Sequence, residues 1–269
     1  MALLSKGHST HIREAAVPPS RCADLACGGR DRNGEDMTRG PTTIADGAGL
    51  LDRLPLHRHE VAAMGRVWRI DAVRDQSALL GVAEDLEQFP FGLLLWESSI
   101  ALADRLGAEP GGLAGTNVLE IGAGAGLAGL AAASAGARVN QTDHSPEAIA
   151  LCRRNAKLND IVGVSLGQSD WRDWHDARRY DLIIGADVLY ERETHALVAD
   201  ILARNLAPSG HAIFADPRRV DTPDFIASLR AEGWRVELES AEVPAIVPVR
   251  PGQSVIIDLI TLRRPGIAL

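Results

Sequence analysis

A glycine-rich segment that follows an acidic residue is the part of this sequence best suited to chemistry. Residues 118–126 read Val-Leu-Glu-Ile-Gly-Ala-Gly-Ala-Gly, and a run of Leu and Ala follows over 127–135. The apolar start predicts a buried strand, and the Leu/Ala run predicts a helix. The glycines permit positive φ angles and let a ligand approach the backbone without a Cβ in the way. The segment therefore predicts a strand, a ligand-binding turn and a helix.

The glycine spacing fits two cofactor classes. A dinucleotide motif, G-x-G-x-x-G, runs from Gly124 to Gly129, whereas the E-x-G-x-G-x-G motif of class I S-adenosylmethionine methyltransferases runs from Glu120 to Gly126. The apolar strand ends against Gly122, so the turn begins there and Glu120 lies at the strand's carboxyl end. A carboxylate at that point would repel a pyrophosphate, but it can orient the amino-acid end of a sulfonium cofactor. We therefore predict that S-adenosyl-L-methionine is the cofactor and that this segment binds it through Glu120, Gly122, Ala123, Gly124 and Gly126.

Further acidic residues follow the next expected strands. Asp143 ends the second strand and suits the ribose hydroxyls of a nucleoside. Asp170 follows the third strand and can accept a hydrogen bond from an adenine amino group, while Trp171 packs on the ring. Because ligands of open α/β sheets bind beyond the carboxyl ends of the strands, we expect these residues to meet the glycine turn.

The segment from Ile184 to Tyr190 predicts the acceptor side of the site. Its strand ends in Gly-Ala, which lets a ligand lie flat, so Ala186 is a predicted cofactor contact. Asp187 and Tyr190 then emerge beside the ligand. Methyl transfer requires mainly that the nucleophile is aligned and water is excluded. A carboxylate and a phenol can orient an amine and stabilise the cation formed on transfer, so Asp187 and Tyr190 are the predicted catalytic residues.

Alternating strands and helices must position these residues, which predicts an α/β fold with a doubly wound sheet and helices on both faces. The expected strands are 118–121, 139–142, 162–166, 182–186, 211–215, 234–240 and 254–262, the last two antiparallel. The expected helices are 97–106, 127–135, 146–158, 193–206 and 223–232. Near the N-terminus, a break at 74–76 between apolar runs at 59–73 and 77–83 predicts a hairpin.

Composition limits the remaining possibilities. The chain has 269 residues, 46% of them hydrophobic, which suffices for a large core, and its net charge of −8 argues against nucleic-acid binding. No apolar run is long enough to cross a bilayer, so no membrane partner is expected. The three cysteines lack metal-ligand or disulfide spacing, which predicts no metal site and a cytoplasmic location.

Residues 1–55 are rich in small, polar and charged residues and contain no aromatic residue, which predicts a disordered tail. Residues 56–269 are the expected methyltransferase domain, with residues 56–112 as its hairpin and helix extension.

Five motifs in this order resemble the class I, seven-β-strand protein methyltransferases of methyltransferase family 16, a family also linked to nicotinamide N-methylation. They are Trp96-Glu97-Ser98-Ser99, residues 118–126, Asp170-Trp171, Asp187-Val188-Leu189-Tyr190 and Ala215-Asp216-Pro217-Arg218. The resemblance implies a Rossmann-like sheet of order 3-2-1-4-5-7-6 with an antiparallel last strand. It adds Trp96 as a cofactor contact and implies methylation of a protein lysine. Asp216-Pro217-Arg218-Arg219 also resembles the D-P-x-R of some members, although it fits a rigid strand-end turn equally well.

Two other functions stay open at this point. A small-molecule N-methyltransferase of the nicotinamide kind would require a closed acceptor pocket, and a non-catalytic binding protein could retain the cofactor fold. The sequence gives no indication of the oligomeric state.

The cofactor assignment predicts a selective thermal shift. S-adenosylmethionine or S-adenosylhomocysteine, at a hundredfold excess over Kd, should stabilise the protein by about 2.7 kcal/mol, because a ligand that binds only the folded state shifts unfolding by mass action. NAD should leave the melting temperature unchanged. A shift with NAD alone would show that the glycine motif has been assigned to the wrong cofactor class.

Overall fold

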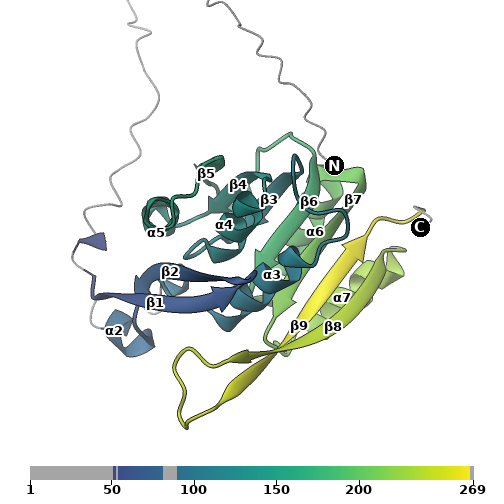
Figure 1. Ribbon diagram of the computed structural model, residues 1–269. Helices are drawn as coiled ribbons and strands as arrows, with labels where there is room; N and C mark the ends of the chain where they lie inside the picture. The colour runs from purple at the N-terminus through teal and green to yellow at the C-terminus, as the bar shows by residue number, and fades with distance from the viewer. Residues whose placement is uncertain (1–50, 53, 81–89, 267–269) are drawn as a thin grey trace, which may run out of the picture. The chain divides into compact units, whose positions relative to one another are not determined.

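A seven-stranded sheet, of order β5-β4-β3-β6-β7-β9-β8, organises the protein. The computed structural model describes residues 51–52, 54–80 and 90–266, shown in colour in Figure 1. The strands of the sheet are β3 (Asn117–Ile121), β4 (Arg138–Asp143), β5 (Val164–Gln168), β6 (Tyr180–Ala186), β7 (Leu206–Asp216), β8 (Arg235–Pro244) and β9 (Ser254–Arg263). The helices are α2 (Gln76–Leu80), α3 (Glu97–Gly107), α4 (Leu127–Ser134), α5 (Pro146–Leu158), α6 (His195–Asn205) and α7 (Thr222–Ala231). The described residues also form the short 3-10 turns η2 (Phe91–Leu93), η3 (Trp171–Asp173) and η4 (Arg192–Thr194).

The sheet topology confirms the predicted fold class. Strands β3 to β7 pair in parallel, while β9 lies between β7 and β8 and is antiparallel to both. Numbered from β3, this order is the expected 3-2-1-4-5-7-6. Only residues 245–253 join β8 to β9, which is too short for a parallel crossover.

Both faces of the sheet are buried, each under its own helices. Neighbouring residues of a strand point to opposite faces. Val118 therefore packs in a core with residues of α3 and α4, whereas Leu119 packs in a second core with residues of α6 and α7. Because both faces need apolar cover, a central strand such as β6 is hydrophobic on both faces, with Leu182, Ile183 and Ile184 all buried.

The predicted N-terminal hairpin exists, but its predicted position was wrong. It consists of β1 (Leu56–Ala63) and β2 (Arg66–Val73), joined at Met64-Gly65, and both turn residues have positive φ angles of 52° and 68°. That is the backbone of a two-residue type I′ turn, whose twist matches that of the strands. The expected break at residues 74–76 instead begins helix α2, because the Asp75 carboxylate accepts a hydrogen bond from the Ala78 N–H.

The hairpin is joined to helix α5 by two asparagines one helical turn apart. Asn155 accepts from the Asp71 N–H and donates to the Asp71 carbonyl, each at 2.9 Å. Asn159 makes the same pair of bonds with Arg69, at 3.0 and 2.7 Å. Positions i and i+4 of a helix thus match positions i and i+2 of a strand. Asn155 also donates to the Ala125 carbonyl in the glycine turn, so it connects the hairpin to the glycine turn.

Other boundaries agree with prediction within a few residues, except at β7. Its expected start at His211 was wrong, because pairing with β6 begins at Leu206, across an irregularity near Tyr180. Residues 1–50, which hold most of the predicted disordered tail, lie outside the described residues. Among the helices described here, none has the length and apolarity that crossing a bilayer requires.

Replacing Asn155 with Ala should lower the free energy of unfolding by about 1–3 kcal/mol, because it leaves buried backbone groups of Asp71 without partners. Denaturant unfolding would measure the change. Lys157→Ala, on the exposed side of the same helix, is the matched control and should change stability by less than about 0.5 kcal/mol. Equal effects of the two substitutions would contradict the role given to Asn155.

Candidate active site

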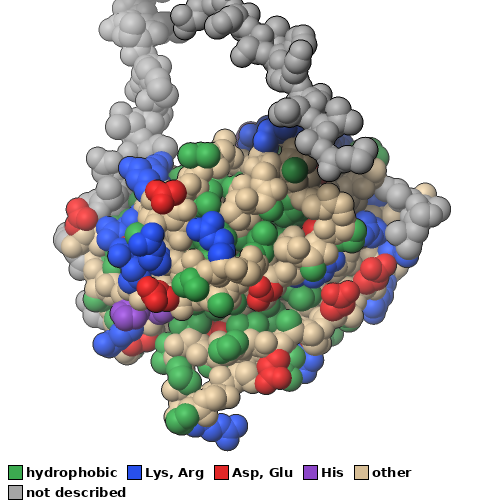
Figure 2. All heavy atoms as spheres, viewed as in Figure 1, with side chains coloured by type: hydrophobic (Ala, Val, Ile, Leu, Met, Phe, Trp, Pro, Cys, Tyr) green, Lys and Arg blue, Asp and Glu red, His purple; other side chains and the backbone are tan. Residues whose placement is uncertain are grey.

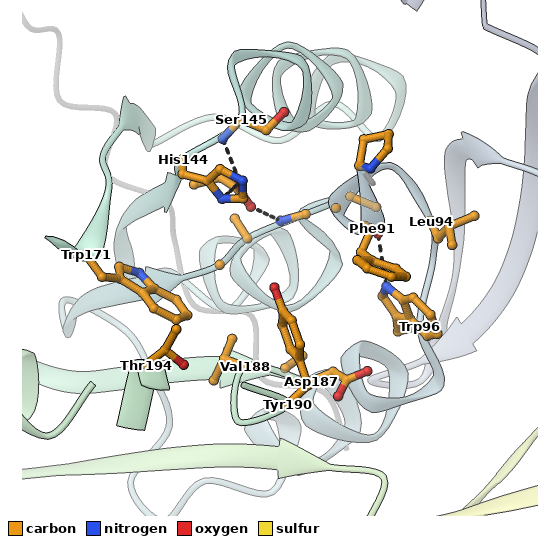
Figure 3. Close-up of a pocket in the computed structure, with 18 of the residues that line it drawn as sticks. Phe91, Leu94, Trp96, His144, Ser145, Trp171, Asp187, Val188, Tyr190 and Thr194 are labelled. Atoms are coloured by element: carbon orange, nitrogen blue, oxygen red, sulfur yellow. Dashed lines mark hydrogen bonds and ion pairs between the residues drawn. The ribbon is translucent and has the colours of Figure 1, made fainter. Parts of the chain in front are cut away.

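A pocket of about 470 Å³ lies where β3, β4 and β6 end. Its size is typical of small-molecule and cofactor sites. In Figure 3, Trp171 lies on one side of the pocket, Phe91 and Trp96 lie on the other, and Tyr190 points between them. Every predicted site residue except Glu120 lines it: Trp96, Gly122, Ala123, Gly124, Gly126, Asp143, Asp170, Trp171, Ala186, Asp187 and Tyr190.

The glycine turn has the backbone that its sequence predicts. Gly122, Gly124 and Gly126 have φ angles of 61°, 54° and 86°, in the region that disfavours other residues. Space is limited as well, since a Cβ on Gly122 would lie 2.9 Å from the Val188 side chain. A Cβ on Gly124 would lie 3.2 Å from the Gly92 carbonyl oxygen. The turn therefore exposes backbone rather than side chains to the pocket.

Asp143 joins the glycine turn to helix α5. One of its oxygens accepts from the Gly124 N–H at 2.9 Å, and the other accepts from the Ser145 N–H at 3.0 Å. The residue is buried, and this burial raises the pKa of the carboxyl, while the two N–H donors act in the opposite direction. Asp143 thus fixes the glycine turn through the Gly124 N–H and also lines the pocket. Its contact with a ribose stays a prediction.

Glu120 lies behind the glycine turn and does not line the pocket. Its carboxylate accepts from the Gly129 N–H at 3.1 Å and from the Gln141 amide at 2.6 Å. The same amide donates to the Gly126 carbonyl at 2.9 Å. Burial raises the pKa of Glu120 to about 7. In the structure Glu120 therefore supports the turn and the start of α4. Because its side chain does not line the pocket, its predicted contact with the amino-acid end of the cofactor stays a prediction.

The two sides of the pocket are formed by aromatic residues on short turns. Trp96 donates from its indole nitrogen to the Phe91 carbonyl at 3.1 Å, and the two rings are 6.4 Å apart. On the opposite side, Asp170 accepts from the Arg172 N–H at 2.8 Å, which forms the turn that carries Trp171. Sequence reasoning identified Trp96, Asp170 and Trp171 but assigned no site role to Phe91.

Asp187 is held by an arginine that sequence reasoning did not assign to the site. Both oxygens of Asp187 pair with the Arg219 guanidinium, at 2.8 and 2.6 Å. The Asp187 backbone has a φ of 56°, an unusual value for a residue other than glycine. Asp216 shapes the turn that returns Arg219, since it accepts from the Arg219 N–H and from the Thr222 hydroxyl, each at 2.8 Å. The D-P-x-R resemblance was the available signal for Arg219.

Tyr190 and Asp187 point in different directions. In Figure 3 the Tyr190 hydroxyl points into the middle of the pocket, whereas the Asp187 carboxylate points away from it. The Tyr190 ring lies 6.3 Å from that of Phe91, and both side chains are 42% exposed. Burial of the hydroxyl and the surrounding carboxylates raise the pKa of Tyr190, so the phenol keeps its proton near neutral pH.

Sequence reasoning also missed other residues that line the pocket: Pro90, Gly92, His144, Glu147, Glu191, Thr194 and Leu197. His144 and Glu191 directly follow the predicted residues Asp143 and Tyr190, whereas Leu197 reaches the pocket from helix α6. Within the described part of the chain, no group of three or more potential ligands could hold a metal ion.

The raised pKa of Glu120 predicts a pH-dependent stability. Below about pH 4.5 the carboxyl is protonated in both states, and between 4.5 and 7 only the folded state keeps the proton. The unfolded chain then binds fewer protons, so stability falls as pH rises through this window. The Glu120→Gln side chain stays neutral at every pH. Relative to that variant, the free energy of unfolding of the wild type should fall by on the order of 3 kcal/mol between pH 4.5 and 7. Parallel curves of unfolding free energy against pH for the two proteins would contradict this.

The sequence is similar to those of known methyltransferases. The chain is 34% identical over 124 residues to Histone-arginine methyltransferase METTL23 of Xenopus laevis, covering 44% of this chain and 53% of the relative. It is 32% identical over 118 residues to Protein N-lysine methyltransferase METTL21A of Xenopus tropicalis, covering 42% and 54%. The match thus spans about half the length of these curated relatives.

A solved structure shares the fold. The N-methyltransferase NodS of Bradyrhizobium japonicum WM9, in complex with S-adenosyl-L-homocysteine, superposes with a TM-score of 0.50 at 24% identity, covering 63% of this chain and 87% of NodS. The family model described as lysine methyltransferase matches residues 74–232, more than half of the 269 residues and a range that includes every predicted site residue. This chain therefore belongs to the lysine methyltransferase family, whose members are S-adenosylmethionine-dependent enzymes.

Proposed function

We propose that this protein transfers a methyl group from S-adenosylmethionine to a lysine side chain of another protein. The family description and the relatives named as lysine methyltransferases support this acceptor. The relative named for histone arginine makes a guanidinium the main alternative acceptor. The site geometry at Asp187 and Tyr190 supports the amine over the guanidinium.

The pocket suits the proposed cofactor. The glycine turn offers backbone rather than side chains, and Asp143 lies beside it. The lining residues carry more carboxylates than guanidinium groups, with Asp143, Glu147, Asp170, Asp187 and Glu191 against Arg172. When bound, S-adenosylmethionine supplies a methyl group on a positively charged sulfur, which such a pocket favours. The glycine turn, Asp143, Asp170 and Trp171 are the residues that would hold it.

The acceptor side favours an amine over a guanidinium. A guanidinium binds best to two parallel carboxylate oxygens, and the Arg219 fork already occupies both oxygens of Asp187. A lysine amine needs only single acceptors, which the outer edge of Asp187 and the Tyr190 hydroxyl can supply. The amine must arrive neutral, so it would lose its proton to water before its nitrogen lone pair forms the new N–C bond. The methyl–sulfur bond would break in the same step, and S-adenosylhomocysteine would leave with the bonding electron pair. We assign Asp187 and Tyr190 to orienting it.

The exposure of Tyr190 is the observation that carries the protein-substrate proposal. Its hydroxyl points into the pocket while 42% of the side chain remains open to solvent. A small nicotinamide-like acceptor would favour an enclosed pocket, whereas a lysine on a protein surface requires an open one.

The remaining assignments are proposals of the same kind. We take residues 56–269 as the methyltransferase domain and the cytoplasm as its location, which is consistent with the free, buried thiol of Cys152. The net charge of −8 supports a protein rather than a nucleic-acid partner.

Incubation with a cell lysate and radiolabelled S-adenosylmethionine tests the proposal. We expect the label to appear on protein and to be recovered as methyllysine after hydrolysis. Label in small molecules would favour the nicotinamide-like alternative, label in methylarginine would favour a guanidinium acceptor, and absence of transfer would favour a binding protein.

The Asp187–Arg219 pair should affect turnover but not cofactor binding. Asp187→Ala should lower turnover about a hundredfold or more, because the acceptor loses a positioning group, with the Kd for S-adenosylhomocysteine nearly unchanged. Arg219→Ala should act in the same direction, and the double variant should be little worse than the poorer single variant, because the two residues act as a unit.

Asp200→Ala, on the exposed side of α6, is the control and should behave like the wild type. Normal methylation by Asp187→Ala would refute the role given to this carboxylate, and additive losses in the double variant would show that the two residues act separately.

A further inference from the structure

The loop between β8 and β9 projects from the sheet and contains hydrogen bonds of its own (Figure 1). The Ala245 N–H donates to the Gln253 carbonyl at 2.9 Å, and the Val249 N–H donates to the Gln253 side chain at 2.8 Å. Pro248 and Pro251 further restrict the backbone. The loop backbone is therefore restricted, which lowers the entropy cost of binding a partner.

This loop is fixed next to the pocket. The Ile246 N–H donates to the Glu97 carboxylate at 2.8 Å, across 149 positions of sequence. Glu97 directly follows Trp96, which lines the pocket. Strand β8 also runs in the same direction as β7, because both are antiparallel to β9. The loop after β8 therefore leaves the sheet at the carboxyl end of the parallel strands, which is the end where the pocket lies.

The tip of the loop exposes apolar side chains. Val247 is 59% exposed and Val249 is 93% exposed. Arg250 follows them, is exposed, and has no ion pair within the described part of the chain. Figure 2 shows hydrophobic and basic side chains together at this projection, at the bottom of the view. Two exposed valines beside a basic residue, at the pocket end of the sheet, make this tip a candidate interaction site.

We propose that residues 245–253 form a docking arm for the substrate protein, an inference that rests on the proposed function. An apolar side chain of the substrate packs against Val247 and Val249, and a neighbouring carboxylate pairs with Arg250, while the substrate lysine enters the pocket. The link through Glu97 favours this occupant, because it holds the loop beside the segment that carries Trp96, at the end of the sheet where Tyr190 points into the pocket. A second copy of the chain is disfavoured, since copies with a net charge of −8 repel each other.

The test compares the full-length wild type with the double variant Val247→Ser/Val249→Ser. The readout is the lysate concentration that gives half-maximal labelling of the methylated protein, with radiolabelled S-adenosylmethionine as the probe. We expect this concentration to rise about tenfold, with the Kd for S-adenosylhomocysteine and the melting temperature unchanged. Arg250→Glu should raise it as well, whereas Arg250→Lys should retain most of the wild-type value.

Val162→Ser is the matched control, because Val162 is 85% exposed but precedes β5, at the opposite edge of the sheet. It should leave the half-maximal concentration unchanged. If the wild type labels protein and the double variant needs no more lysate, the docking arm is refuted and the proposed function stands. If the wild type labels no protein, both fail. A wild-type dimer that the double variant dissociates would show that a second copy occupies the loop, which also overturns the proposal.

Discussion

The hydrogen bonds between buried carboxylates and backbone N–H groups hold the site together. Asp143 binds the N–H groups of Gly124 and Ser145, and Glu120 binds that of Gly129. The glycine turn makes few backbone bonds of its own, so without these acceptors its buried donors would be unsatisfied. Desolvation of a carboxylate is costly, and N–H donors offset part of that cost. The turn is therefore preorganised by the ends of the same strands that form the pocket.

The buried carboxylate on the acceptor side, Asp187, is stabilised by a charged side chain instead. Asp187 is almost fully buried and carries a left-handed backbone angle, and its charge is balanced by Arg219 rather than by backbone donors. The guanidinium fork leaves the carboxylate rigid but only partly available, which limits its proposed role to orienting a single amine. Tyr190 then remains as the uncharged group that reaches the middle of the pocket.

Elements outside the central sheet support the site from two sides. The β1–β2 hairpin is bound to α5 by Asn155, which also reaches the carbonyl of Ala125 in the glycine turn. On the other side, Glu97 holds the β8–β9 loop next to the segment that carries Trp96. Both connections are side-chain to backbone bonds, so they fix the position of a whole segment rather than that of one side chain.

The sequence alone determined the fold class, the glycine turn and most of the pocket. These depend on short-range rules: strand and helix periodicity, the need for glycine at positive φ, and the convergence of parallel strand ends. Tertiary structure decided the rest, because the partners are far apart in the chain. Glu120 accepts a hydrogen bond from Gln141, 21 positions later, behind the glycine turn, and Asp187 forms an ion pair with Arg219, 32 positions later. The turn at Met64-Gly65 and the contact between Glu97 and Ile246 likewise depend on packing that no local pattern encodes.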